Sequence, residues 1–354
     1  MRFEPEDFIV EEIPLYEPTG VGTHTFFAIR KRGLTTFEAI KHIAGVLTVN
    51  PNDIGYAGLK DKHALTTQVL SVHGITPERI LKIDLSDIEI LWASGHGHKL
   101  RVGHLRGNRF EIILRDIPLI HIPIIKDRML RFQSEGVPNR FGDQRFGNKQ
   151  DTHLIGKALV KKDWKTLVNY IRTDSFPIKA GERLLQDDPD KMEKVIRSIP
   201  HRMRRLYLSA YQAYLFNRIL DMRLQNLGRL CDGDVAIKHI NNAPFLVKDA
   251  SKEQSRADTF EISPSGPIFG YKMRQPVGKI QEMEDSLLKS EGLRHDAFRK
   301  VAGIRLAGTR RPLRMKLEFH KVEKVDEGIR LYFSLPVGCY ATVVLSELYN
   351  YLDG

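Results

Sequence analysis

The chain has little cysteine and no long apolar segment. Its 354 residues include only two cysteines, Cys231 and Cys339, so a disulfide framework and any site built on a Cys-x-x-Cys pair are excluded. No apolar run approaches the roughly 20 residues that cross a bilayer, and the acidic start, MRFEPEDFIVEEIP, lacks the apolar region of a secretory signal. No glycine-rich stretch has the spacing of a nucleotide-phosphate loop. These absences predict a cytoplasmic protein.

Basic residues outnumber acidic ones. The chain has 55 Lys and Arg residues against 44 Asp and Glu, a formal net charge of +11 and a pI near 9.5. Many of them gather in basic cluster 1 (Arg197, His201, Arg202, Arg204 and Arg205) and basic cluster 2 (Arg294, Arg299, Lys300, Arg305, Arg310, Arg311, Arg314 and Lys316). Because such clusters bind phosphates and release counterions, this distribution favours a nucleic-acid partner over a basic protein without one.

The first part of the chain alternates expected strands with helices. Segments rich in Phe, Ile, Val and Thr predict strands at residues 8–13, 25–30, 54–57 and 67–72. Between the second and third strands, apolar residues at helical spacing predict a helix capped by Thr35 or Thr36. Residues 99–105 and 109–115 are expected to form a hairpin that turns near Gly107-Asn108.

The middle of the chain has a different residue pattern from the first part. Helix-forming segments dominate from about Thr152, residues 263–270 are expected to be a loop because they contain proline and glycine, and strand patterns return after Pro312. This order predicts an α+β fold in which residues 1–151 and 313–354 form a core with a mixed or antiparallel sheet flanked by helices. Residues 152–312 would form an inserted, mostly helical α/β domain.

The segment GLKDKHALTTQ, residues 58–68, places one carboxylate between two ammonium groups. Asp61 is flanked by Lys60 and Lys62 in a turn between two expected strands. Cations within about 4–6 Å favour the ionised carboxylate and keep it available as a nucleophile. The alternative is a solvated turn with a charge-paired aspartate, and this segment by itself does not decide between the two.

Five segments occur here in the order in which they recur in one protein family. They are PEDFIVEE (residues 5–12), GLKDKHALTTQ (58–68), GNRF (107–110), PNRFGDQRFG (138–147) and GCYAT (338–342). Together they resemble the TruD tRNA pseudouridine synthases, although any one of them would be weak evidence. The resemblance covers both ends of the chain and the middle of the core, while the stretch from about Thr152 to Pro312 matches mainly in position and character.

The resemblance implies a pseudouridine synthase-like core and an isomerase. Such an enzyme detaches a uridine base in tRNA, turns it over and rejoins it to the sugar through C5. The resemblance places Asp61 at the catalytic position and points to uridine 13 as the target. The reaction uses no redox cofactor, metal or ATP, so no cofactor is expected. The expected partner is tRNA, and the protein is expected to be a monomer.

Four residues match the family's substrate-contacting positions: Phe8, Asn139, Phe141 and Tyr340. A target base inside folded RNA must be flipped out, and stacking on an aromatic side chain contributes about 1–3 kcal/mol per base. Tyr340 stands where the family often has phenylalanine, so the ring is kept and a hydroxyl is added. The alternatives are core packing for the three aromatic residues and a turn for Asn139.

A basic partner of the Asp61 carboxylate is also expected, because catalytic aspartates in related synthases pair with one. Arg2, which precedes the PEDF motif, is the first candidate, and Lys60, Lys62 and Arg145 are rivals. The alternative for Arg2 is a frayed terminus.

Two other functions stay open, a non-catalytic basic RNA-binding protein and a metal-dependent nuclease or phosphotransferase. The nuclease would need a cluster of carboxylates or histidines at ligand spacing, which the sequence does not show.

Overall fold

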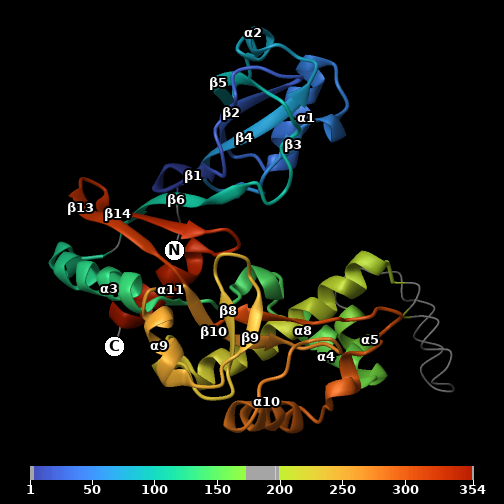
Figure 1. Ribbon diagram of the computed structural model, residues 1–354. Helices are drawn as coiled ribbons and strands as arrows, with labels where there is room; N and C mark the ends of the chain where they lie inside the picture. Colours follow the sequence, from blue (N-terminus) through green and yellow to red (C-terminus); the bar gives the residue numbers. More distant parts are fainter. Residues whose placement is uncertain (1–3, 116, 173–195, 197–198, 353–354) are drawn as a thin grey trace. The chain divides into compact units, whose positions relative to one another are not determined.

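The computed structural model describes residues 4–115, 117–172, 196 and 199–352 (Figure 1). The chain divides into two compact units. Unit 1 comprises residues 1–133, 316–341 and 347–354, and unit 2 comprises residues 134–315 and 342–346. The units therefore divide near residues 133 and 315, whereas the domain assignment from sequence, with boundaries at 151 and 312, stays a prediction.

Unit 1 is built on one eight-stranded mixed sheet with the order β13-β14-β6-β1-β4-β2-β5, and β3 pairs with β4 off this path. β1 and β4 run parallel, and the other strand pairs of this sheet, within the described residues, are antiparallel. The strands are β1 (Phe8–Pro14), β2 (His24–Arg32), β3 (Gly55–Tyr56), β4 (Leu65–His73), β5 (Ile88–His96), β6 (Leu105–Leu114), β13 (Glu318–Val325) and β14 (Gly328–Pro336).

The helices of unit 1 and at its boundary with unit 2 are α1 (Thr36–Leu47), α2 (Pro77–Ile80), α3 (Ile122–Glu135) and α11 (Ala341–Leu352), with short 3-10 turns η1 (Pro5–Asp7), η2 (Pro51–Asp53) and η3 (Leu119–His121). Thr35 caps α1: its side chain accepts a hydrogen bond from the Glu38 main-chain N–H, and the Glu38 carboxylate accepts one from the Thr35 main-chain N–H. The apolar side of α1, including Ile40 and Ile43, packs with Phe27 of β2 in a buried cluster. The predicted helix and its cap are confirmed.

The predicted hairpin at Gly107-Asn108 is wrong. β6 runs straight through this pair, with Gly107 opposite Ile13 of β1 and Pro336 of β14. A Cβ atom on Gly107 would lie 2.2 Å from the main-chain oxygen of Leu335. Glycine is therefore needed here because another backbone approaches closely, and not because the chain turns.

Unit 2 is helical with a small sheet. Its helices are α4 (Thr152–Lys161), α5 (Trp164–Arg172), α8 (His201–Met222), α9 (Ala250–Asp258) and α10 (Lys279–Ser290), with 3-10 turns η4 (Asp143–Phe146), η5 (Leu224–Asn226) and η6 (His295–Phe298). A four-stranded sheet has the order β11-β10-β8-β9, with β8 (Val235–Lys238), β9 (Pro244–Leu246), β10 (Ile262–Ile268) and β11 (Thr309–Pro312). A separate pair joins β7 (Val137–Pro138) and β12 (Arg314–Met315). α8 supplies much of the core, including the fully buried Tyr211 and Phe216.

The loop expected at residues 263–270 is instead mostly strand β10, which is buried along nearly its whole length. Residues 262–264 pair only with β8, and residues 265–268 pair only with β11. Pro264 and Pro267 lack an N–H donor, but each pairs with only one neighbouring strand, and the main-chain oxygen of Pro264 still accepts a hydrogen bond from the Leu313 N–H. Proline and glycine content misled the prediction because it carries no information on which edge of a strand is paired.

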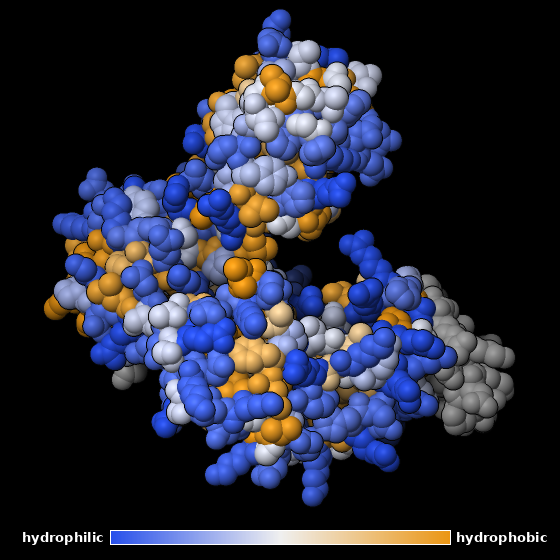
Figure 2. All heavy atoms as spheres, in the orientation of Figure 1, coloured by the Kyte–Doolittle hydropathy of each residue, from blue (hydrophilic) through white to orange (hydrophobic). Residues whose placement is uncertain are grey.

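With unit 1 built on a mixed sheet and unit 2 mostly helical, the predicted α+β class is confirmed. Within the described residues, no helix is both long and apolar enough to cross a membrane. Hydrophilic residues cover most of the face of the molecule seen in Figure 2, and apolar residues occupy smaller areas of it.

Candidate active site

Asp61 lies in the loop between β3 and β4, in unit 1. Its side chain is exposed, while the neighbouring Lys60 is buried. The main-chain oxygen of Asp61 accepts a hydrogen bond of 3.0 Å from the amino group of Lys31. Among the described residues, no side chain forms an ion pair or hydrogen bond with the Asp61 carboxylate. The loop therefore holds the backbone of Asp61 and presents its carboxylate to the outside.

The two lysines beside Asp61 are engaged with other carboxylates. The amino group of Lys60 lies 2.7 Å from Oε2 of Glu12, and both side chains of this pair are almost completely buried. The amino group of Lys62 lies 2.9 Å from Oε1 of Glu38 in an exposed pair. Flanking an aspartate in sequence thus does not make these lysines its partners. Arg2 falls outside the described residues, so its pairing with Asp61 stays a prediction.

Phe8 opens strand β1, one residue before Ile9, which pairs with Leu65 at the start of β4. The strand pairing therefore brings the PEDF segment beside the end of the Asp61 loop. The Phe8 ring is only 8% exposed and meets Phe110 edge-on, with ring centroids 6.2 Å apart. This ring packs in the interior of unit 1, which agrees with core packing, the alternative considered for this residue. Its contact with substrate stays a prediction.

Asn139 and Phe141 lie in unit 2, and Arg311 of β11 contacts both. Arg311 donates hydrogen bonds to the main-chain oxygen of Asn139, at 3.2 Å, and to its Oδ1 atom. The Asn139 amide nitrogen donates to the main-chain oxygen of Pro312 at 3.0 Å, and the residue is only 5% exposed. The Arg311 guanidinium also lies over the Phe141 ring, 4.3 Å from its centroid. Both groups of the Asn139 amide are thus bonded within unit 2.

Arg145 lies close to the same ring, with its guanidinium carbon 5.5 Å from the Phe141 centroid. It belongs to unit 2, and Asp61 belongs to unit 1. Tyr340, which belongs to unit 1 and directly precedes α11, is 45% exposed. The predicted site residues thus divide between the units: Asp61, Lys60, Phe8 and Tyr340 are in unit 1, whereas Asn139, Phe141 and Arg145 are in unit 2.

Three residues whose side chains hold the predicted site residues in place were not identified from the sequence. Glu12 and Lys31 follow the alternating apolar positions of β1 and β2, so they point to the buried face of their strands. A charged residue at an inward position of such a pattern is a signal that could have identified both. Arg311 offered no comparable signal, because it stood only as one member of basic cluster 2.

The members of the two basic clusters differ in their exposure to solvent. In basic cluster 2, Arg310 is buried in a bidentate pair with Glu284, and the buried Arg314 donates to main-chain oxygens, which removes both from the surface. The exposed members of the clusters are His201, Arg202, Arg205, Arg294, Arg299, Lys300, Arg305 and Lys316. Arg197 lies outside the described residues. Phosphate binding by the exposed members stays a prediction.

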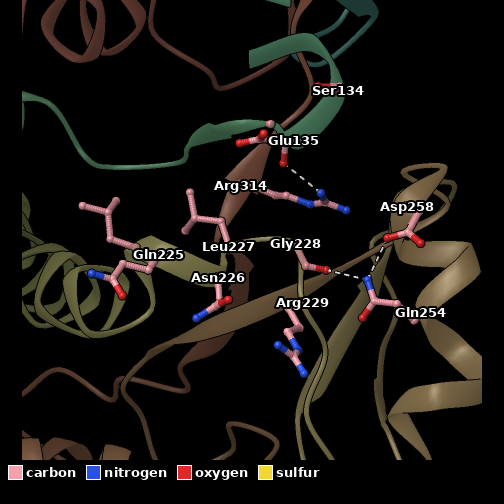
Figure 3. Close-up of a pocket in the computed structure, with 12 residues that line it drawn as sticks. Ser134, Glu135, Gln225, Asn226, Leu227, Gly228, Arg229, Gln254, Asp258 and Arg314 are labelled. Carbon is pink, nitrogen blue, oxygen red and sulfur yellow. Dashed lines mark hydrogen bonds between the residues drawn. The ribbon is translucent and has the colours of Figure 1, made fainter. Parts of the chain in front are cut away.

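A pocket of about 490 Å³ opens in unit 2 and holds none of the predicted site residues (Figure 3). The Gln254 amide donates to the main-chain oxygen of Gly228 and to Asp258, and Arg314 donates to the main-chain oxygen of Glu135. These bonds join the walls of the pocket to one another.

Within the described part of the chain, no group of three or more His, Cys, Asp or Glu side chains is placed to hold a metal ion.

The comparisons with known proteins agree with one another. The family model described as tRNA pseudouridine synthase D (TruD) matches residues 1–184 and 179–348. A tRNA pseudouridine synthase D from Syntrophotalea carbinolica is 42% identical over 374 residues, which cover 97% of this chain and 94% of the relative. One from Geobacter sulfurreducens is 40% identical over 380 residues, which cover 97% and 92%.

The fold agrees with the sequence matches. A crystal structure assigned to TruD from Methanosarcina mazei matches with a TM-score of 0.81 at 27% sequence identity, covering 98% of this chain and 92% of that one. The family model and these relatives extend over nearly the whole chain, including all five segments on which the resemblance rests. The chain belongs to the TruD family of tRNA pseudouridine synthases.

Proposed function

We propose that this protein isomerises uridine 13 of tRNA to pseudouridine in the cytoplasm, with Asp61 as the catalytic carboxylate. The observation that carries this proposal is the exposed Asp61 carboxylate, on a loop whose backbone is held by Lys31, in a chain of the TruD family. Breaking and rejoining the glycosidic bond needs a carboxylate beside the sugar, either to attack C1′ or to remove a proton from C2′. The proposed reaction uses no cofactor.

The proposed substrate contacts differ in how directly the fold supports them. Tyr340 supports base stacking best, because almost half of its surface is exposed. Phe141 has the Arg311 guanidinium over its ring, so its role is stacking on a ring face that Arg311 does not cover. Asn139 can read a base edge with the lone pair and N–H that its bonds to Arg311 and Pro312 leave over.

Incubation of the purified protein with uridine-containing tRNA transcripts tests this function. Position-resolved detection of pseudouridine is expected to show conversion at uridine 13. A transcript with cytidine at that position is the control and should stay unmodified. Modification confined to another uridine would contradict the proposed target but not the reaction, and no modification of any transcript would contradict the reaction.

Affinity for tRNA should depend steeply on salt. The exposed members of the basic clusters are expected to contact phosphates, and each neutralised phosphate contributes about 0.7–0.9 to the slope of log Kd against log salt concentration. Replacing Arg299 and Lys300, both exposed, by glutamine should lower this slope by about 1 per lost contact. Filter binding at several salt concentrations measures it. A flat response would show that these residues lie off the RNA path.

A further inference from the structure

One short segment holds all three residues of the Lys60-Asp61-Lys62 turn. This corner segment, residues 31–38, joins the end of β2 to the start of α1. Lys31 donates to the main-chain oxygen of Asp61, and Thr36 Oγ1 accepts the main-chain N–H of Lys60 at 2.9 Å. Glu38 pairs with Lys62. Each residue of the turn thus has its own anchor in the corner segment.

Lys31 is an unusual anchor because it is a buried cation bonded to neutral groups. Its side chain is only 1% exposed, and its amino group donates to the main-chain oxygens of Leu34 and Asp61. Burial of an ammonium group without a bonded carboxylate is costly, so apolar packing alone would favour another residue here. Burial lowers the pKa of Lys31 to about 8, and the nearby Asp61 carboxylate acts in the opposite direction.

Thr36 connects the entry of the turn to the strand that leaves it. Besides accepting the Lys60 N–H, its hydroxyl donates to Oε1 of Gln68 in β4 at 2.9 Å. Thr36 is 2% exposed and Gln68 is fully buried, so water does not compete for these bonds. The main chain is therefore fixed on both sides of the peptide that joins Lys60 to Asp61, at the Lys60 N–H and at the Asp61 oxygen.

We propose that Lys31 and Thr36 are positioning residues that hold the Asp61 carboxylate in the geometry needed for catalysis. This inference rests on the proposed role of Asp61. The carboxylate makes no bond of its own to any described side chain, so its position follows from the backbone that carries it. A displacement of about 1 Å at a reacting group can cost about 10²-fold in rate.

Two shape-conserving substitutions test this proposal. Lys31→Met removes the donors and the charge, and Thr36→Val removes both hydroxyl bonds. At saturating tRNA, the single-turnover rate is expected to fall about 10²-fold for Lys31→Met and about 10-fold for Thr36→Val, while the Kd for tRNA is unchanged. Thr25→Val is the matched control, because the buried Thr25 hydroxyl donates to the main-chain oxygen of Ile75, away from the turn. It should keep the wild-type rate.

A pH profile separates positioning from simple stability. Lys31 faces three charged groups, Asp61, Lys60 and Glu38. Because its pKa is about 8, the single-turnover rate of the wild type should fall as the pH rises through this value, and Lys31→Met should lack this alkaline decline. Thr25→Val should keep it. A wild-type rate that stays level up to pH 9.5 would contradict the role of the Lys31 charge.

The outcomes also distinguish this inference from the role of Asp61. Wild-type turnover in Asp61→Ala would overturn the role of Asp61 and this inference with it. An inactive Asp61→Ala together with wild-type rates in Lys31→Met and Thr36→Val would overturn the positioning role alone. If Lys31→Met does not fold, an undiminished rate in Thr36→Val still overturns the proposal.

Discussion

Asp61→Asn should abolish turnover while leaving tRNA binding and folding unchanged. The neutral amide can neither attack C1′ nor take a proton from C2′, so the loss does not depend on which of these is the first step. We expect the single-turnover rate to fall by at least about 10³-fold, in the range seen when a catalytic group is removed. Folding should be unaffected, because the carboxylate is exposed and only the Asp61 main-chain oxygen is bonded to Lys31.

Asp53→Asn is the matched control for this substitution. Asp53 is an exposed aspartate of unit 1, eight residues before Asp61 in the sequence, and its side chain makes no hydrogen bond or ion pair within the described residues. The same change in charge at this position should leave the rate and the Kd for tRNA unaltered. Pseudouridine formation by Asp61→Asn at the rate of Asp53→Asn would rule out a catalytic role for Asp61.

Lys60→Met should cost about 3–5 kcal/mol of unfolding free energy, because it leaves the buried Glu12 carboxylate without its cation. The two side chains of this pair are 4% and 1% exposed and lie 2.7 Å apart. The remaining hydrogen bond to Glu12, from the Val69 amide, is 3.3 Å long and cannot replace a cation. The loss should occur in unit 1, where β1 and the Asp61 loop are joined by this pair.

Urea unfolding followed by tryptophan fluorescence measures this cost. The chain has two tryptophans, Trp92 in unit 1 and Trp164 in unit 2, so a Trp164→Phe background leaves one that reports on unit 1. Lys62→Met is the matched control: the same change removes a lysine from an exposed pair in the same loop and should alter stability little. Adding Glu12→Met to Lys60→Met should restore much of the loss, since it removes the unpaired carboxylate. Equal stability of Lys60→Met and Lys62→Met would contradict this account.

Local sequence patterns correctly predicted those elements whose formation depends on residues close together in the chain. The helix after Thr35 was predicted with its cap, because both the apolar spacing and the Thr35–Glu38 capping box lie within a few residues. The errors at Gly107 and at residues 263–270 have a common cause. Glycine and proline act there through the approach of another strand and through the choice of paired edge, which are settled by segments far away in the sequence.

The Asp61 turn also combines features that depend on nearby residues in the sequence with features that depend on distant ones. The sequence by itself determined the family, through five ordered segments, and with it the fold class and the position of the expected catalytic carboxylate. Only the tertiary structure decided the pairing of the adjacent charges, because ion pairs form between side chains that the fold brings together. Lys60 pairs with Glu12, which lies 48 residues earlier, and Asp61 is held through its main chain by Lys31, 30 residues earlier.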